Sequence, residues 1–404
     1  MASIVSRMSH AGAPRRSRRR PVTVAGVIAV AFVAALSPPA SASLFAPPAP
    51  PTGQLDFGTY VFAEPFNELE LRRLRAAGGE VIRTTFMWSK VQRTPLPFYD
   101  WSEYDALVAR AAAAGVSILP VLIGSPQFVA PRGAAPPTTP LGKALFARYA
   151  RAAVERYGPG GEFWRENPFV PYEPIEAWEV WNEPNLASFW TEGDPDAQEY
   201  AALLKLIGGA IHEADPRAKV VFAGMPEPRG SRPIPADEFL ADVYEVPGIE
   251  AAFDVVAAHP YAGSVGGVDR RLARLRAVMR RNGDEEKPLW ITELGWSSTG
   301  IDHYLVKDLD SQARLTRDTI AMLRERAAEY KLGTVIFFRW QDPDVGCSKV
   351  GGCWYDNAGL FTSDERPKPA WKAFARGAGG RPLSGPLPAD FFDDVTLLTL
   401  DAAG

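Results

Sequence analysis

Two glutamates stand out because each follows a short apolar run and lies among tryptophans. Glu183 lies in the segment Trp178-Glu179-Val180-Trp181-Asn182-Glu183-Pro184-Asn185, and Glu293 lies in Trp290-Ile291-Thr292-Glu293-Leu294-Gly295-Trp296. Two carboxyl groups on separate strand ends are what acid/base and nucleophilic attack on a glycosidic bond require. Either glutamate alone would be interpreted as solvated or paired with an arginine. The shared setting of the two favours a catalytic pair.

Eight strand-like apolar runs alternate with amphipathic helical patterns in the region that surrounds these glutamates. Strands are predicted over residues 55–61, 81–85, 117–123, 175–181, 220–223, 255–258, 289–292 and 334–338. Runs that are apolar throughout are buried on both faces, as in a parallel sheet. Eight strand-then-helix units predict an α/β fold, a (β/α)8 TIM barrel that forms a single catalytic domain over residues 55–380. A doubly wound open sheet is the alternative.

The residues that end the predicted strands are the candidates for the site, since a barrel collects its chemistry at the carboxyl ends of its strands. They are Arg83 on strand two, Asn182 and Glu183 on strand four, His259 and Tyr261 on strand six, Glu293 on strand seven and Trp340 on strand eight. Strands four and seven lie on roughly opposite sides of an eight-stranded barrel. The two glutamates are therefore expected to face each other across the barrel mouth.

These motifs resemble the glycoside hydrolases of clan A, which are (β/α)8 enzymes with catalytic glutamates after strands four and seven. Asn182-Glu183-Pro184 is similar to the acid/base motif of that clan, and Thr292-Glu293-Leu294-Gly295-Trp296 is similar to its nucleophile strand. Within the clan, residues 181–186 with Phe189-Trp190 are most similar to family 39, the β-xylosidase and iduronidase group. Cellulase-like family 5 comes next. The tail over residues 381–404 is too short for the β-sandwich of family 39 enzymes.

The resemblance implies a double displacement with retention of configuration. Glu293 would attack the anomeric carbon as a carboxylate, while Glu183 would first protonate the leaving oxygen and then deprotonate water. Arg83 and the hydroxyl of Tyr261 would favour the negative charge on Glu293. Asn182 would bind the 2-hydroxyl group of the sugar.

For other residues of the predicted mouth, both a sugar-binding and a structural interpretation apply. His259 is expected to contact the sugar or a residue behind it, although a lone histidine is often only structural. Tryptophans can stack on the C–H face of a sugar or pack in a core. Six of them fall near the mouth: Trp88, Trp181, Trp190, Trp296, Trp340 and Trp354. Trp340 is the preferred platform under the cleaved sugar, as the resemblance implies for the end of strand eight.

The first 42 residues have the pattern of a secretory signal peptide. Six arginines precede an apolar run over residues 22–36, and the small residues Ala40-Ser41-Ala42 follow. Cleavage after Ala42 would change the formal charge from −4 to about −10, which disfavours nucleic acid as a partner. We expect a secreted protein, exported by the Sec or the twin-arginine route, with a proline-rich linker over residues 43–54.

Cys347 and Cys353 are the only cysteines, and they lie in a glycine-containing loop after the last predicted strand. In an exported chain they are expected to form a disulfide, with free thiols as the alternative.

The histidines have no paired metal-ligand spacing, so neither a metal nor another cofactor is predicted. The expected partner is a poly- or oligosaccharide, bound by a monomer without membrane contact after signal cleavage. A transglycosylase and an inactive carbohydrate-binding barrel remain open.

Overall fold

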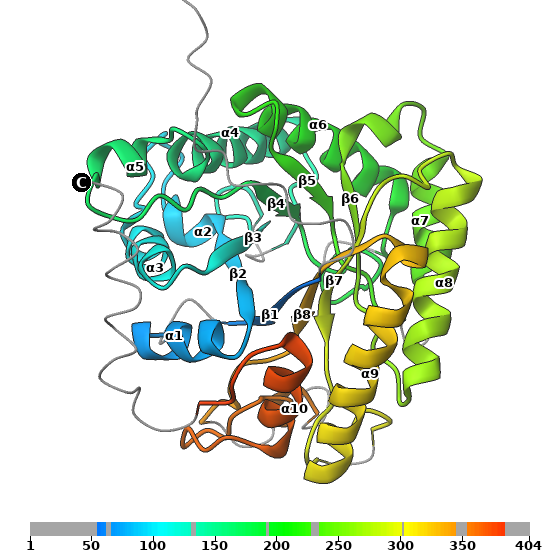
Figure 1. Cartoon of the computed structure of the whole chain (residues 1–404). Coiled ribbons are helices and arrows are strands. Elements are labelled where there is room, and N and C mark those ends of the chain that lie inside the picture. Colours follow the sequence, from blue (N-terminus) through cyan, green and yellow to red (C-terminus); the bar gives the residue numbers. More distant parts are fainter. Residues whose placement is uncertain are drawn as a thin grey trace, which may run out of the picture. The chain divides into compact units, whose positions relative to one another are not determined.

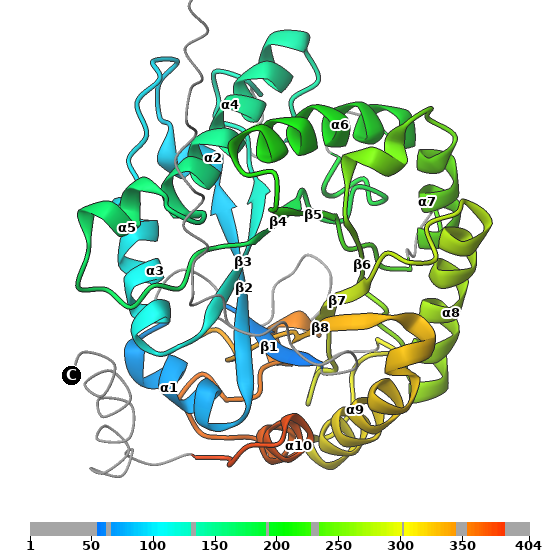
Figure 2. The ribbon, with the colours of Figure 1, turned by 45° about the horizontal axis from the view of Figure 1, so that its top comes forward.

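The computed structural model describes residues 55–61, 66–130, 135–190, 194–227, 234–300, 303–344 and 354–383. Eight strands, all parallel, close into a barrel in the order of the sequence, β1 to β8, which excludes the open sheet. Figure 2 shows the strands at the centre of a ring of helices. The strands are β1 (Asp56–Tyr60), β2 (Gly79–Met87), β3 (Ser117–Ile123), β4 (Ala177–Val180), β5 (Lys219–Phe222), β6 (Val255–Ala258), β7 (Leu289–Leu294) and β8 (Leu332–Phe337).

The helices cover the outside of the barrel (Figure 1). They are α1 (Glu68–Ala76), α2 (Trp88–Val91), α3 (Ser102–Ala113), α4 (Pro140–Tyr157), α5 (Glu162–Glu166), α6 (Ala197–Ala214), α7 (Ala236–Tyr244), α8 (Val265–Arg281), α9 (Leu309–Tyr330) and α10 (Pro369–Ala378), with 3₁₀ turns η1 (Ile249–Ala252) and η2 (Tyr355–Asn357). Helix α1 begins with a capping box, in which Asn67 and Glu70 each accept a hydrogen bond from the other's backbone N–H.

The apolar core has two parts, as the geometry of a barrel requires. The larger part lies between the strands and the ring of helices. The smaller part fills the barrel interior with side chains from several strands, among them Val81, Ala257, Trp290 and Ile336. Successive side chains of a strand point to opposite faces, so the residue two positions further along points inward again. The same interior-facing register therefore continues above this apolar plug as a layer of polar side chains.

All eight predicted strands are present, and two of them, β3 and β6, have the predicted bounds. Strand β2 runs on to Met87, so Arg83 lies within the strand and not at its end as predicted. Strand β8 ends at Phe337, one residue earlier than expected. The predicted signal peptide, linker and Cys347–Cys353 disulfide fall outside the described residues, as does the tail beyond Leu383.

In the part of the chain that the structure describes, each helix is either too short or too polar to cross a bilayer.

Candidate active site

Glu183 and Glu293 meet at the carboxyl end of the barrel. Glu183 follows β4 in the turn after Asn182, and Glu293 is the fifth residue of β7. Both residues are 8% exposed. One carboxylate oxygen of each lies within 4.8 Å of the other and of a ring nitrogen of His259. The two glutamates thus face each other, as the strand positions predicted.

Arg83 holds the polar layer together from inside the barrel. Its guanidinium group donates from Nη1 to Glu293 (2.7 Å), from Nη2 to the amide oxygen of Asn182 (2.8 Å), and from Nε and Nη2 to Glu179 (2.6 and 3.1 Å). Arg83 is 1% exposed and Glu179 is fully buried. The two carboxylates raise the pKa of Arg83 despite its burial, so the guanidinium stays charged. A buried cation therefore links the two strands that carry the glutamates.

Glu293 has two strong donors. Arg83 contacts Oε1, and the hydroxyl of Tyr261 donates to Oε2 at 2.7 Å. Burial raises the pKa of Glu293, while the charge of Arg83 and the hydrogen bonds from Tyr261 and Arg83 oppose that rise. Burial and the charge of Glu293 raise the pKa of Tyr261 well above 10, so its hydroxyl remains a donor. This environment stabilises a carboxylate at position 293.

Glu183 has no such cation in contact. Burial raises the pKa of Glu183 well above its ordinary value, and the charge of Glu293 raises it further. Its Oε1 lies 2.8 Å from Nδ1 of His259. Burial and then the charge of Arg83 lower the pKa of His259 well below 6.5, so the ring is neutral. A protonated carboxylic acid beside a neutral imidazole is the state that these neighbours favour.

The hydrogen bonds behind His259 determine which of its ring nitrogens carries the proton. Glu179 forms an ion pair with Arg83 and offers acceptor oxygens, so the hydroxyl of Thr292 donates to it at 3.1 Å. That hydroxyl must then accept from Nε2–H of His259, 3.1 Å away. Nδ1 is left unprotonated and accepts the O–H of Glu183. The chain Glu183–His259–Thr292–Glu179 therefore orients the proton that Glu183 would deliver.

Gly224, just after β5, allows this chain to close. Its N–H donates to Glu179 (3.0 Å) and its carbonyl accepts the N–H of Glu183 (3.1 Å). A Cβ atom at position 224 would lie 2.1 Å from Nε2 of His259 and 2.4 Å from the hydroxyl oxygen of Thr292. No side chain fits in that space, so glycine is required for the close approach of backbone and ring.

The turn after β4 carries backbone strain at the site. Trp181 and Glu183 have φ values of 75° and 45°, in the left-handed region that costs a residue other than glycine about 1–3 kcal/mol. Surrounding bonds hold this turn: the N–H of Trp181 donates to the carbonyl of Leu122 (3.0 Å), and its indole N–H donates to the carbonyl of Phe189 (3.1 Å). The strain is local to the segment that aims Glu183.

Trp340, the predicted sugar platform, is almost fully buried after β8. It is 4% exposed, packs against Phe66, Phe361 and Trp371, and donates its indole N–H to Glu70 (3.0 Å). Phe338, the first residue after β8, packs beside Tyr261. Trp340 lines the pocket next to this site, and a stacking role for its ring stays a prediction.

Phe338 lies half-buried among the aromatic rings of the mouth. Its ring centroid lies 5.3 Å from that of Tyr60, 6.4 Å from Tyr261 and 6.1 Å from Trp354. Trp354 is also partly exposed, whereas the other four tryptophans predicted near the mouth pack in the core: Trp88, Trp181, Trp190 and Trp296. The aromatic surface beside Glu293 thus consists of phenylalanine, tyrosine and Trp354.

A pocket of about 800 Å³ adjoins this aromatic surface between β1, α1 and the segment after β8. Tyr60 and Phe338 belong to its wall, which connects it to the glutamate pair. Its charged lining consists of one cation, Arg339, and five acidic residues: Glu70, Asp342, Asp344, Asp356 and Glu365. Carboxylate acceptors beside ring faces suit the hydroxyls and C–H faces of a neutral sugar.

Glu183, His259 and Glu293 could also be considered as metal ligands, since one ligand atom of each lies within 4.8 Å of the others. The guanidinium of Arg83, however, is only 2.7 Å from Glu293. A metal ion held by Glu293 would lie beside that positive charge. The neighbours therefore favour a hydrogen-bonded proton in this space over a divalent cation.

Two residues of the polar layer, Glu179 and Thr292, were not selected from the sequence. Both share the interior-facing register with apolar residues of the plug: Glu179 is two positions after Ala177, and Thr292 is two after Trp290. A charged residue inside an otherwise apolar strand was the available signal for Glu179. Phe338 had no comparable signal in the sequence, because an aromatic residue at a strand end is ordinary.

Comparison with known proteins extends these observations. One relative in sequence is a β-xylosidase of Geobacillus stearothermophilus, 24% identical over 242 residues that cover 55% of this chain and 42% of that protein. The chain thus matches less than half of the length of this relative. No protein-family model matches the chain.

Solved structures share the barrel. A family 39 glycoside hydrolase from Bacteroides cellulosilyticus WH2 superposes with a TM-score of 0.58 and 22% identity, over 80% of this chain and 63% of the other. A monomeric β-xylosidase from Caulobacter crescentus CB15 gives 0.58 and 19%, over 80% and 67%. The predicted (β/α)8 fold and the resemblance to clan A, nearest to family 39, are confirmed.

Proposed function

We propose that this protein is a secreted, retaining glycoside hydrolase that cleaves β-glycosidic bonds of a poly- or oligosaccharide. One observation carries the proposal: Glu183 and Glu293 are equally buried and lie within 4.8 Å, but only Glu293 contacts a cation. Retaining enzymes have their two carboxyl groups about 5–5.5 Å apart, whereas inverting enzymes need about 6.5–9.5 Å to admit a water molecule. One carboxylate oxygen of Glu183 lies within 4.8 Å of one of Glu293, which is nearer to the retaining than to the inverting spacing and supports direct attack by one carboxylate.

In the first step, a carboxylate oxygen of Glu293 forms a bond to the anomeric carbon on the face opposite the leaving group. The bond from that carbon to the glycosidic oxygen breaks, and the oxygen takes the proton of Glu183. The negative charge of Glu293 is consumed in the glycosyl ester, so the electrostatic support for a protonated Glu183 falls. Glu183 then remains as a carboxylate, ready to act as a base.

In the second step, Glu183 removes a proton from water while the water oxygen bonds to the anomeric carbon and the ester bond to Glu293 breaks. Two inversions give net retention. Arg83 and Tyr261 receive the returning charge on Glu293. Between turnovers, His259 accepts a hydrogen bond from the protonated carboxyl group of Glu183. The proton stays on Glu183, because the neutral form of His259 is favoured.

The sugar would be held by groups around this pair. Asn182 gives its amide oxygen to Arg83, which leaves the amide N–H₂ to donate to the 2-hydroxyl of the sugar. Phe338 offers a half-buried ring beside Tyr261, and the pocket lined by Tyr60 would receive further hydroxyls. Since two similar proteins are β-xylosidases, β-xylosides are the first substrates to test.

The decisive experiment measures sugar release by the purified mature protein across β-linked polysaccharides and aryl glycosides, beside Glu183→Gln and Glu293→Gln. Release of the β-anomer by the parent alone supports a retaining hydrolase and gives its substrate class. Binding without release on every substrate would instead identify a carbohydrate-binding barrel. Products longer than the substrate would identify a transglycosylase. Release of the α-anomer would contradict the double displacement.

A further inference from the structure

A basic groove runs along the outside of the barrel between α9 and α10, away from the glutamates. It holds about 780 Å³. Five exposed cationic side chains line it: Arg314, Arg317 and Arg324 on α9, and Lys372 and Arg376 on α10. Asp310 is the one acidic residue in the described lining. The groove is thus strongly positive, although the chain has a formal charge of −4.

The cations follow the helix geometry. Arg314, Arg317 and Arg324 are three and seven residues apart, so they form one stripe of about 15 Å along α9. Lys372 and Arg376 are four residues apart on the facing helix and form the second stripe. Small and aliphatic side chains, such as Ile320 on α9, make up the floor between them.

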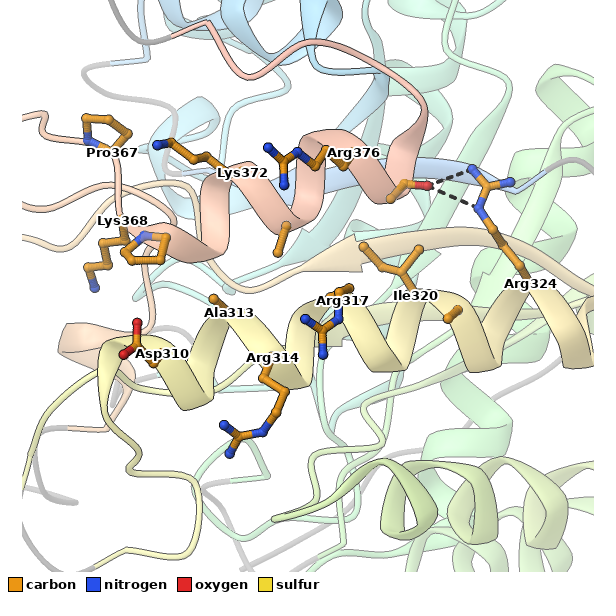
Figure 3. Close-up of a pocket in the computed structure, with 14 residues that line it drawn as sticks. Asp310, Ala313, Arg314, Arg317, Ile320, Arg324, Pro367, Lys368, Lys372 and Arg376 are labelled. Atoms are coloured by element: carbon orange, nitrogen blue, oxygen red, sulfur yellow. Dashed lines mark hydrogen bonds between the residues drawn. The ribbon is translucent and has the colours of Figure 1, made fainter.

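The ends of the groove differ (Figure 3). At one end Nε and Nη2 of Arg324 donate to the carbonyl of Gly377 at 3.1 and 2.8 Å, which joins the two helices and closes the groove. At the other end lie Asp310 and the segment Pro367–Lys368, where both helices begin. Helices of a (β/α)8 barrel begin at the face that carries the active site. The groove therefore opens toward the catalytic face.

The cations of the groove differ in the partners they already have. Arg317 is paired with the exposed Asp318 next to it, and Arg314 contacts the hydroxyl of Ser311. Among the described residues, the structure shows no carboxylate in an ion pair with Lys372 or Arg376. An exposed charge that already has a partner gains little from a second one. Lys372 and Arg376 are therefore the best probes of the groove.

From this groove we infer a second, non-catalytic binding site for carboxylate-bearing segments of a polysaccharide, such as uronate units. That the polyanion is a polysaccharide rests on the proposed function. None of the described lining residues is aromatic, which disfavours neutral sugars and single-stranded nucleic acid, since both are held by ring stacking. A concave groove also differs from the convex apolar face that inserts into a membrane.

The two sites have complementary preferences. The pocket beside the glutamates has five acidic residues against one cation, Arg339, and so disfavours acidic units, while the groove attracts them. A polymer with a neutral backbone and acidic branches would therefore be cut in its neutral part and held by its acidic part. The groove would raise the local concentration of such a polymer without taking part in bond cleavage.

The test measures binding of polygalacturonate and of its carboxyl-reduced form to the full mature chain carrying Glu293→Gln, by titration calorimetry at low and high salt. We expect binding of the acidic polymer alone, weakened by salt. In that background, Lys372→Ser/Arg376→Ser should weaken it about fivefold. The control pair Arg270→Ser/Arg281→Ser removes the same charge from exposed positions on α8 and should change little.

Equal binding of the reduced polymer, or an equal loss with both double variants, would overturn the inference. So would tighter binding of duplex DNA or of anionic phosphatidylglycerol vesicles, or binding that appears only after residues 384–404 are removed. Sugar release by the parent without polygalacturonate binding would reject the groove and keep the proposed function. Binding through Lys372 and Arg376 without sugar release on any substrate would keep the groove and reject the proposed function.

Discussion

The ends of β4 and β7 present the same residue in two different electrostatic settings. Glu183 and Glu293 are both glutamates, both 8% exposed and both within reach of His259. Burial raises the pKa of each. Only Glu293 has Arg83 and Tyr261 in hydrogen-bond contact. Residue type and burial therefore do not distinguish an acid from a nucleophile at this site; the direct neighbours do.

The neighbours of Glu183 complete the contrast. Glu183 contacts a neutral imidazole whose other nitrogen is committed to Thr292, and it feels the charge of Glu293. Three carboxyl groups, those of Glu179, Glu183 and Glu293, lie buried near a single cation, Arg83. The group without direct contact to that cation retains its proton most readily. Glu179 and Glu293 contact Arg83 directly, which leaves Glu183 as the protonated one.

The strongest test of this contrast removes the carboxylate at β7. Glu293→Gly should lower turnover about 10⁴-fold or more, because no other group can form the glycosyl ester. Azide should restore activity in the space left behind and yield a glycosyl azide of inverted configuration. Activity is measured with an aryl β-glycoside, with and without azide. Absence of rescue in a folded variant would count against Glu293 as the nucleophile.

Removing the carboxyl group at β4 should produce a different pattern. Glu183→Ala should lower turnover about 10²–10⁴-fold on substrates with poor leaving groups, since these need the proton. Substrates with very good leaving groups should still form the glycosyl ester. The measurement is a series of aryl glycosides of decreasing leaving-group pKa. An equal loss along the whole series would contradict the assignment of Glu183 as the acid.

The sequence predicted the parts of this site that depend on local pattern. Eight apolar runs predicted eight strands, and the positions of Glu183 and Glu293 within them predicted that the two would meet. The position of Arg83 inside β2, rather than at its end, was not predictable, because the polar residues Thr84 and Thr85 interrupt the apolar run. The strand nevertheless continues to Met87, because it pairs with β3 over residues 117–123.

Interactions between distant segments explain the rest of what the sequence did not reveal. The proton chain joins Glu179, Thr292 and His259 from three strands, and only closure of the barrel brings them together. Phe338 and Trp340 both follow the end of β8, and the sequence did not indicate that Phe338 would pack beside Tyr261. Trp340 packs on Trp371 of α10, a contact that local sequence does not encode.

Gly224 tests whether the proton chain requires its close approach. Gly224→Ala would push a methyl group into His259 and Thr292. We expect a loss of stability of about 1–3 kcal/mol from overpacking, with turnover reduced more on poor than on good leaving groups. Thermal unfolding and the aryl glycoside series measure the two effects.

The matched control is Gly209→Ala on α6, where an added Cβ would have no neighbour within 4 Å. That substitution should stabilise the helix by about 0.5–1 kcal/mol and leave turnover unchanged. If Gly224→Ala behaved like Gly209→Ala, the hydrogen-bond chain would not need the close approach seen here.

The smallest expected effect on activity comes from removing the hydroxyl of Tyr261, which donates to Glu293 and not to Glu183. Tyr261→Phe removes a 2.7 Å hydrogen bond to the carboxylate, which should lower kcat/KM about tenfold or more. That bond lowers the pKa of Glu293, so its loss raises this pKa. Since Glu293 must be ionised, the acidic limb of the pH profile of kcat/KM should move to higher pH, and the alkaline limb, set by Glu183, should move less.

Tyr200→Phe is the control for this shift. Tyr200 is equally buried, but its hydroxyl donates to the carbonyl of Val180 and accepts from the N–H of Ala223, with no contact to either glutamate. Its loss should affect stability and leave the acidic limb in place. An acidic limb that stays fixed in Tyr261→Phe, or shifts equally in both variants, would mean that Arg83 alone determines the ionisation of Glu293. The difference between the two strand ends would then rest on a single cation.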